Sequence, residues 1–239
     1  MNKKWVIPDI HGYVNTLTAL IEEKIKPDKS DELYFLGDYI DRGPGIKEVL
    51  DFLINLKKDG YLVTTLKGNH EDVLVELYDE EKNSKNPWFL HLADHKKKSW
   101  MSMGGKETLK SFGVKNIGDI PSEYIEWMRN LTYFVILDKF ILVHAGLNCN
   151  IDDPFSDKHS MLWLRDYQII PEKTGFRRII HGHMPVNIQF IDLSIKNNVY
   201  PFIDLDNGLY MAGKPGYGNL VALELTNMEM VIQDNRDSL

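Results

Sequence analysis

Three short apolar segments in the first third of the chain each run into a cluster of polar and charged residues. The clusters hold Asp9 and His11 after residues 5–7, Asp38, Asp41 and Arg42 after residues 33–36, and Asn69 and His70 after residues 61–66. Short apolar runs bounded by glycine and charged residues are typical of buried strands. Carboxylates placed so close together repel one another unless a positive group lies between them. The sequence therefore predicts strands whose ends meet at a metal site.

The segments between these runs carry apolar residues at helical spacing. One stripe begins at Val14 and stops at the turn residues Pro27 to Ser30, and a second begins at Ile46 and stops at Gly60, a C-cap residue. The order strand, helix, strand, helix, strand predicts parallel pairing of all three strands. Ligands of parallel sheets bind outside the carboxyl ends of the strands, which is where the three polar clusters fall.

The rest of the chain divides into a helical part and a β-rich part. Residues 72–130 have a mainly helical pattern, broken at Gly104 and Gly105, and we interpret them as a helical excursion within one domain that covers the whole chain, 1–239. A hairpin is expected over residues 133–137 and 140–143. Further strands are expected near residues 178–180, 188–193, 199–203, 220–225 and 230–233.

Composition narrows the environment and the partners of the chain. Its 239 residues carry a formal net charge of -7, which argues against long contact with a nucleic-acid backbone. No apolar run approaches the roughly 20 residues that span a bilayer. The first strand begins within five residues of Met1, so we expect a cytoplasmic protein without a membrane partner. Cys149 is the only cysteine, which excludes an internal disulfide and a zinc–thiolate site.

Two more histidines follow predicted strands in the second half of the chain. His144 ends the hairpin, and His183 lies two residues after His181, which points to the opposite side of an extended chain. The nitrogen and oxygen donors that could converge are then Asp9, His11, Asp38, Asn69, His144 and His183.

This donor set suits two divalent metals that share one carboxylate. Asp38 is the natural bridge, because a carboxylate has two oxygens and can hold two cations. Two such cations polarise a water between them, and hydroxide at neutral pH is the result. Manganese, or iron with zinc, fits mixed oxygen and nitrogen ligands, although the order of affinities does not decide which metal is bound.

Five motifs occur in a fixed order between residues 9 and 185. They are Asp-x-His-Gly at residue 9, Gly-Asp-x-x-Asp-Arg-Gly at residue 37, Gly-Asn-His-Glu at residue 68, His-Ala-Gly at residue 144 and Gly-His-x-Pro at residue 182. Together they resemble the bacterial type of the phosphoprotein phosphatase family, within the metallophosphoesterase superfamily. The resemblance implies an α/β protein with the metallo-dependent phosphatase fold, a β-sandwich of two mixed sheets flanked by helices, with a βαβαβ metal-binding core.

The resemblance also implies a role for each matched residue. Asp9, His11 and Asp38 would hold one metal. The other metal would be held by Asp38, Asn69, His144 and His183. His70 would be the general acid for the leaving oxygen, with Asp41 accepting its second ring proton. Arg42, Arg165 and Asn69 would bind the phosphoryl group, and Glu71 would support the site.

Departures from the family pattern bear on the function. Pro8 stands where the family usually has glycine, which fixes φ and removes an N–H just before Asp9. Pro185 occupies the place where nucleases of the wider superfamily carry another histidine, and this favours phosphatases. The tail motif of the eukaryotic protein phosphatases is absent, so the substrate and inhibitor preferences of that group do not transfer.

The sequence therefore predicts a metal-dependent phosphomonoester hydrolase, with phosphorylated serine, threonine or tyrosine of proteins as the preferred substrate. The alternative is symmetrical hydrolysis of a dinucleoside tetraphosphate, a small phosphoester, at a phosphoanhydride bond by the same core. A catalytically inactive binding module is a third hypothesis, disfavoured because no expected ligand, acid or arginine has been replaced. The residues leave the natural substrate, the bound metals and the oligomeric state open.

Overall fold

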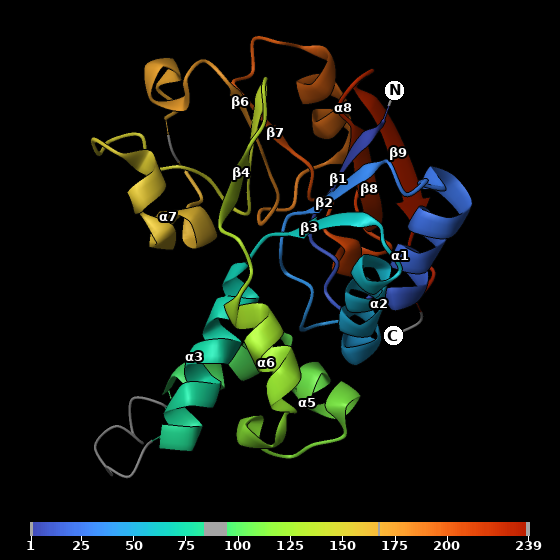
Figure 1. Cartoon of the computed structure of the whole chain (residues 1–239), viewed down its shortest axis with the longest axis vertical. Helices are drawn as coiled ribbons and strands as arrows, with labels where there is room; N and C mark the ends of the chain where they lie inside the picture. The colour runs from blue at the N-terminus through green and yellow to red at the C-terminus, as the bar shows by residue number, and fades with distance from the viewer. Residues whose placement is uncertain (1, 84–94, 167, 238–239) are drawn as a thin grey trace.

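The computed structural model describes residues 2–83, 95–166 and 168–237 (Figure 1). Within these residues the strands form two mixed sheets, with the orders β3-β2-β1-β8-β9 and β4-β5-β6-β7. The strands are β1 (Lys4–Ile7), β2 (Glu32–Phe35), β3 (Leu62–Thr65), β4 (Phe134–Ile136), β5 (Phe140–Val143), β6 (Arg178–His181), β7 (Phe202–Asp204), β8 (Asn219–Glu224) and β9 (Glu229–Asp234). The expected hairpin is present, because β4 and β5 pair antiparallel.

Helices surround the two sheets. They are α1 (Val14–Ala19), α2 (Ile46–Lys58), α3 (Asn69–Asn83), α5 (Lys106–Phe112), α6 (Ser122–Arg129), α7 (Lys158–Trp163) and α8 (Ile188–Lys196). Short helical segments are η1 (Leu20–Ile25), η2 (Met101–Gly105), η3 (Ile117–Asp119), η4 (Pro154–Ser156), η5 (Pro171–Thr174) and η6 (Leu209–Met211). Among the described residues, none of these helices has the length and apolar character needed to cross a bilayer.

The first three strands pair in parallel, as their order in the sequence predicts. Val6 of β1 lies opposite Tyr34 of β2, and Leu33 of β2 lies opposite Val63 of β3. The connecting helices α1 and α2 pack on the outer face of this sheet. All three strands therefore end at the same edge, where the residues that follow them can meet.

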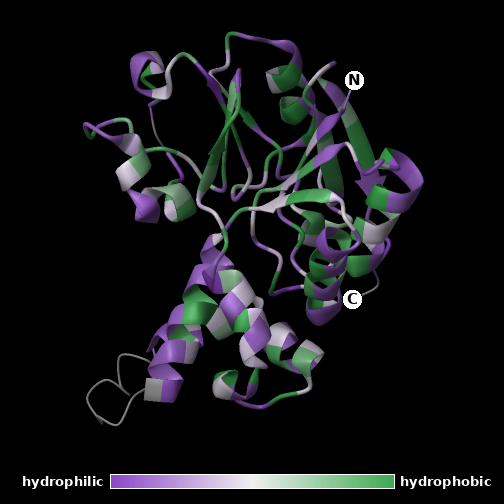
Figure 2. Ribbon diagram, viewed as in Figure 1, coloured by the Kyte–Doolittle hydropathy of each residue, from purple (hydrophilic) through white to green (hydrophobic). Residues whose placement is uncertain are grey.

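Alternate residues of the central strands enter different cores, and this alternation builds the sandwich. Ile7 of β1 packs under α1 and α2, whereas its neighbour Val6 packs between the two sheets. In β5, Leu142 faces the space between the sheets, and Ile141 packs on the opposite face with Met161 of α7. Both faces of these strands are thus buried, and Figure 2 shows much of both sheets in the green of apolar residues. The two mixed sheets confirm the sandwich that the family resemblance implies.

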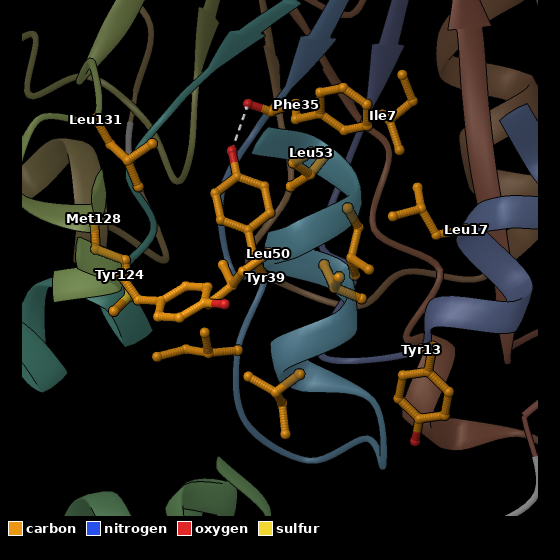
Figure 3. Close-up of a cluster of buried hydrophobic side chains, with 14 of the residues drawn as sticks. Ile7, Tyr13, Leu17, Phe35, Tyr39, Leu50, Leu53, Tyr124, Met128 and Leu131 are labelled. Atoms are coloured by element: carbon orange, nitrogen blue, oxygen red, sulfur yellow. Dashed lines mark hydrogen bonds between the residues drawn. The ribbon is translucent and has the colours of Figure 1, made fainter. Parts of the chain in front are cut away.

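A buried tyrosine fixes the loop that follows β2. The Tyr39 hydroxyl donates hydrogen bonds to the carbonyl oxygens of Phe35 at 3.1 Å and Leu66 at 2.8 Å. Its ring lies among apolar side chains of α2, such as Leu53, and of α6, such as Met128 (Figure 3). The loop that carries Asp38 and Asp41 is therefore anchored by the core itself.

Helices α3, α5 and α6 form a group that extends from one end of the sheets (Figure 1). α3 packs against α6 and η3. α5 packs against α2, one of the helices that cover the first sheet. Gly104 interrupts the helical path at η2 with φ +114° and ψ 9°, which confirms the predicted break. This group is the helical excursion predicted over residues 72–130, of which residues 84–94 lie outside the described residues, and it returns the chain to the hairpin at β4.

One expected strand is wrong, since residues 188–193 are helical and form part of α8. The Asn187 side chain caps this helix by accepting a hydrogen bond from a backbone N–H of the first turn. Ile191 and Ile195 share one face and pack between the sheets, whereas Leu193 is 47% exposed. The isoleucines suggested a strand by composition, but their spacing of four residues is that of a helix face.

The next strand is shorter than predicted, because β7 begins at Phe202 rather than at residue 199. Pro201 precedes it and has no N–H to donate to a sheet ladder. β7 pairs in parallel with β6, so that Asp204 lies opposite His181. The ends of these two strands are next to each other in the second sheet.

Candidate active site

The loops after five strands, three in the first sheet and two in the second, meet in one cluster. Together with the first residues of α3, Asn69 and His70, these loops supply the cluster, which consists of Asp9, His11, Asp38, Asp41, Arg42, Asn69, His70, His144 and His183. His144 Nε2 lies 3.0 Å from Asn69 Oδ1 and 3.5 Å from Asp38 Oδ1, so the second sheet contributes directly to the cluster of the first. His183 donates its backbone N–H to Asp9 Oδ1 at 3.1 Å. The structure thus brings all the predicted metal ligands together.

Asp38 lies at the centre of this cluster and is 2% exposed. Its Oδ2 is 3.7 Å from His11 Nε2 and 3.7 Å from His70 Nε2. Two groups of possible ligand atoms share it, one with His11 and His70 and the other with His144 and His183, and within each group the atoms lie within 4.8 Å of one another. A carboxylate shared by two donor groups has the arrangement expected of a bridging ligand.

The imidazoles are held in the form that binds metal. His11 Nδ1 approaches the Ile40 carbonyl oxygen at 2.8 Å, and His144 Nδ1 approaches the Leu36 carbonyl oxygen at 3.0 Å, which directs both Nε2 atoms toward the cluster. Burial lowers the pKa of His11 and of His144, which favours the neutral form of each ring. The Nε2 atoms of His11 and His183 are buried without a hydrogen-bond partner among the described residues. Neutral rings with a buried free nitrogen fit a metal.

The buried carboxyl groups of the cluster would be stabilised by a positive charge. Burial, and then the carboxylates of Asp206 and Asp38, raise the pKa of Asp9 well above its ordinary value. Burial alone would raise the pKa of Asp38 too, but the surrounding histidines, His144 first, hold it well below its ordinary value. Carboxyl groups buried this close together are stabilised by a cation among them. Carboxylates, imidazoles and a carboxamide in one buried cluster therefore fit two divalent ions.

The backbone around the cluster is strained. Eight non-glycine residues have positive φ in the part of the chain that the structure describes. Five of them belong to the cluster, namely His11, Asp38, Asp41, Arg42 and His183. Each such residue costs about 1–3 kcal/mol, which persists only where the surrounding structure holds it. Strain concentrated at these residues marks the cluster as the functional part of the fold.

Glu71 is the clamp that holds the strained loop. Its Oε2 accepts hydrogen bonds from the Asp38 and Gly68 N–H groups, both at 3.0 Å, and its Oε1 accepts one from the Tyr39 N–H at 2.8 Å. A Cβ on Gly68 would lie 2.1 Å from Asp38 Oδ1, so only glycine fits this approach. These contacts agree with the prediction that Glu71 supports the site.

His70 and Asp41 form the expected pair, with His70 Nδ1 2.6 Å from Asp41 Oδ2. Trp100 Nε1 donates to the same Oδ2 at 3.0 Å, and the Thr108 hydroxyl donates to Asp41 Oδ1. Burial opposes a charge on His70, but Asp38 and Asp41 outweigh it and raise the pKa of His70 above its ordinary value. The ring is therefore biased toward the protonated form, with Nε2 facing the cluster.

The two arginines differ in how they are held. Arg42 Nη2 lies 3.5 Å from His70 Nε2, and the guanidinium stacks on Tyr210 at 3.9 Å from the ring centroid. Arg165 follows α7 and is exposed. It lies close enough to His183 to contribute, after burial and His144, to the lowered pKa of that histidine. Arg42 is therefore fixed in place, whereas Arg165 is an exposed side chain near His183.

The sequence reasoning missed several residues that touch this site. Trp100 and Thr108 belong to the helical excursion, for which the sequence analysis predicted no site residue. Tyr210 lies in η6, shortly after Asp206. Asp206 Oδ1 does accept from the Gly208 N–H at 2.7 Å, but its Oδ2 is buried without a hydrogen-bond partner among the described residues. For this segment the sequence offered one indication of a role, the acid Asp206 followed by Asn-Gly.

Comparison with known proteins decides the family. The family described as calcineurin-like phosphoesterase matches residues 3–213. The chain belongs to this family. Metallophosphoesterases use a dinuclear divalent metal centre, and the cluster around Asp38 supplies candidate histidine and aspartate ligands for it. The enzyme class and the family expected from the five motifs are thus confirmed.

Curated relatives of this metallophosphoesterase carry two kinds of name. A symmetrical bis(5'-nucleosyl)-tetraphosphatase of Buchnera aphidicola is 37% identical over 145 residues, which are 60% of this chain and 43% of that protein. Serine/threonine-protein phosphatase 2 of Escherichia coli is 30% identical over 128 residues, 52% of this chain and 55% of that protein. The chain thus spans about half the length of the curated relatives it matches.

A solved structure supports the fold. A protein serine/threonine phosphatase from Saccharomyces cerevisiae aligns with a TM-score of 0.64 at 13% identity, covering 100% of this chain and 81% of that chain. At this identity the likeness concerns the arrangement of the sheets and helices alone. It places the metallophosphoesterase among phosphatase folds.

Proposed function

We propose that this metallophosphoesterase hydrolyses dinucleoside tetraphosphates symmetrically, with Asp38 bridging two divalent metal ions. The observation that carries the hydrolytic function is the position of Asp38 between two groups of buried donors, beside Arg42 and His70. We propose manganese as the metal, with iron and zinc as alternatives, because the donors are oxygen and nitrogen.

The ligands divide between the two sheets. Asp9, His11 and Asp38 would hold one ion. Asp38, Asn69, His144 and His183 would hold the other. When bound, two divalent ions lower the pKa of a water molecule and neutralise charge on the phosphoryl oxygens. The positive φ at His11, Asp38 and His183 is strained and persists only because the surrounding structure holds these ligands in place.

His70 supplies the proton for the leaving oxygen. Its Nδ1 is engaged by Asp41, so Nε2 is the nitrogen that faces the substrate. Asp41 is itself held by Trp100 and Thr108, which fixes the direction of the imidazole. A nucleoside diphosphate needs less help from an acid than a serine alkoxide, so the contribution of His70 depends on the leaving group.

Arg42 and Arg165 bind the phosphoryl oxygens that the metals do not reach. The planar fork of a guanidinium matches two oxygens of one phosphate, and stacking on Tyr210 leaves the Arg42 fork free at its edge. Asn69 lies beside both histidines of the second sheet and adds a carboxamide to the same side. The two guanidinium groups offset part of the negative charge of a polyphosphate.

The choice of substrate reverses the order that the sequence suggested. The relative at 37% identity is named a symmetrical tetraphosphatase, and this favours a dinucleoside tetraphosphate over a phosphoprotein. Protein phosphatase activity is the second candidate, favoured by the relative at 30% identity that is named a serine/threonine-protein phosphatase. Both substrates present a phosphoryl group to the same cluster.

A direct comparison of substrates tests this proposal. We would measure kcat/KM for diadenosine tetraphosphate and for a phosphoserine peptide with manganese present, and identify the nucleotide products by chromatography. The proposal expects at least tenfold preference for the dinucleotide, with ADP as the single nucleotide product. AMP and ATP in equal amounts would show that the cleavage is not symmetrical, and a preference for the peptide would show that the substrate is assigned wrongly. The variant Asp38→Asn controls for contaminating hydrolases.

A further inference from the structure

A cavity of about 320 Å³ lies beside the candidate active site, because Ala145 and Met184, the neighbours of His144 and His183, line it. It is on the face of the second sheet that points away from the first, because Phe202 of β7 packs with the outer residues of that sheet. Asp204 is two residues further along the same strand and lies on the same face. His181, which the sequence analysis placed opposite His183, also lines it. None of these three residues has a role in the proposed hydrolysis.

The walls of this cavity suit a flat aromatic group. Phe190 of α8 and Phe202 are half-buried, with ring centroids 6.4 Å apart and planes inclined by 43°. Met184 and Pro185 add further apolar surface. Its volume is near the lower end of the range for small-molecule pockets, which is enough for one heterocyclic base. Bases stack on phenylalanine rings regardless of their identity.

The floor of the cavity is polar. Asp204 is 3% exposed, and its Oδ1 accepts a hydrogen bond from the Asp206 N–H at 3.0 Å. Burial, and then Asp206, raise the pKa of Asp204 well above its ordinary value, so that the carboxyl group can donate as well as accept. The edge of a purine carries donors and acceptors that match such a group. An aliphatic side chain of a peptide offers no hydrogen bond to it.

The cavity and the cluster share residues. Arg165 lines the cavity, is exposed, and lies close enough to His183 to affect the pKa of that histidine, and Met184 directly follows His183. A ligand with a base in the cavity would thus extend its phosphates past Arg165 toward Asp38. Resting on the proposed function, we propose that this cavity binds one purine base of the dinucleoside tetraphosphate and thereby selects nucleotide over phosphopeptide.

The test separates base binding from hydrolysis. Calorimetry on the manganese-loaded protein would compare ADP with inorganic pyrophosphate, which lacks the base. We expect ADP to bind about tenfold more tightly, within the range known for one stacked base. Phe202→Leu removes the ring and should abolish this difference, and the KM for diadenosine tetraphosphate should rise by about the same factor. Phe176→Leu is the matched control, because Phe176 is 78% exposed and does not line the cavity.

The outcomes distinguish this inference from the proposed function. If Phe202→Leu abolishes the ADP advantage but the dinucleotide is not hydrolysed by the unchanged protein, the cavity is a base site and the proposed reaction is wrong. If the dinucleotide is hydrolysed and Phe202→Leu changes neither the ADP advantage nor KM, the base site is wrong. The inference would also be overturned if ADP bound no more tightly than pyrophosphate and Phe202→Leu raised the KM for a phosphopeptide. The cavity would then bind peptide. Phe190→Leu, on α8, repeats the test if Phe202→Leu does not fold.

Discussion

Replacing Gly104 by alanine tests whether the helical excursion sets the position of Arg42. The Gly104 carbonyl oxygen accepts a hydrogen bond from the Arg42 N–H at 3.4 Å. A Cβ built on Gly104 would lie 2.3 Å from Arg42 N and 2.9 Å from its Cα, far inside ordinary contact. Both atoms are backbone, so the contact cannot be relieved by turning a side chain. Either η2 or the loop that carries Arg42 must move.

The size of the effect follows from these contacts. Positive φ alone costs a residue with a Cβ about 1–2 kcal/mol, and Gly104 has φ +114°. This strain lowers stability but leaves chemistry alone. Relief of the contact moves Arg42 by a substantial part of an ångström, and a displacement of about 1 Å can reduce turnover by about 100-fold. We therefore expect kcat/KM of Gly104→Ala to fall by about 10- to 100-fold.

Gly113→Ala is the matched control for this variant. Gly113 also has positive φ, +67°, but no atom lies within 4 Å of its built Cβ. It should show the loss of stability, measured by thermal unfolding, with unchanged kcat/KM. Both variants would be assayed on diadenosine tetraphosphate at equal metal content. If the kcat/KM of Gly104→Ala equals that of Gly113→Ala, the helical excursion does not position Arg42.

Two further predictions concern the proton donor, His70, and the binding of the phosphoryl group by Arg42. The variant His70→Asn should keep its metals and hydrolyse esters with poorly acidic leaving groups about 10²–10⁴-fold more slowly. Asp41→Asn should show the same change to a smaller extent. Rates for aryl phosphates of graded leaving-group acidity check this, since a loss independent of the leaving group would contradict the role of His70. Tyr210→Leu should raise KM by about 2- to 30-fold by removing the cation–π contact with Arg42, and Tyr210→Phe should restore it. Equal KM values for the two Tyr210 variants would show that the ring does not position the arginine.

The parts of the fold that could be predicted depend on local pattern. The parallel core was predictable because apolar runs, helical stripes and turn residues such as Pro27 and Gly60 alternate regularly. Residues 188–193 misled because isoleucine favours strands, while the helix is decided by the Asn187 cap and by burial of Ile191 between the sheets. That burial is a tertiary contact, which composition does not show.

The candidate site was predictable where a motif places several ligands within a few residues. Residue type and spacing were enough to predict pairs such as Asp9 with His11 and Asn69 with His70. Trp100 reaches Asp41 across 59 residues of sequence, and an isolated tryptophan is most often a core residue. Tyr210 is equally remote from Arg42 in the chain. Such supporting residues become visible only when the fold brings the segments together.

Metal content measured together with turnover tests the central claim most directly. The claim is that Asp38 bridges two divalent ions, so elemental analysis of the purified, manganese-loaded protein should find about two ions per chain. Asp38→Asn should lose bound metal and hydrolysis of diadenosine tetraphosphate together, because a neutral carboxamide cannot offset the charge of two cations. Full metal content with ordinary turnover in Asp38→Asn would contradict the account.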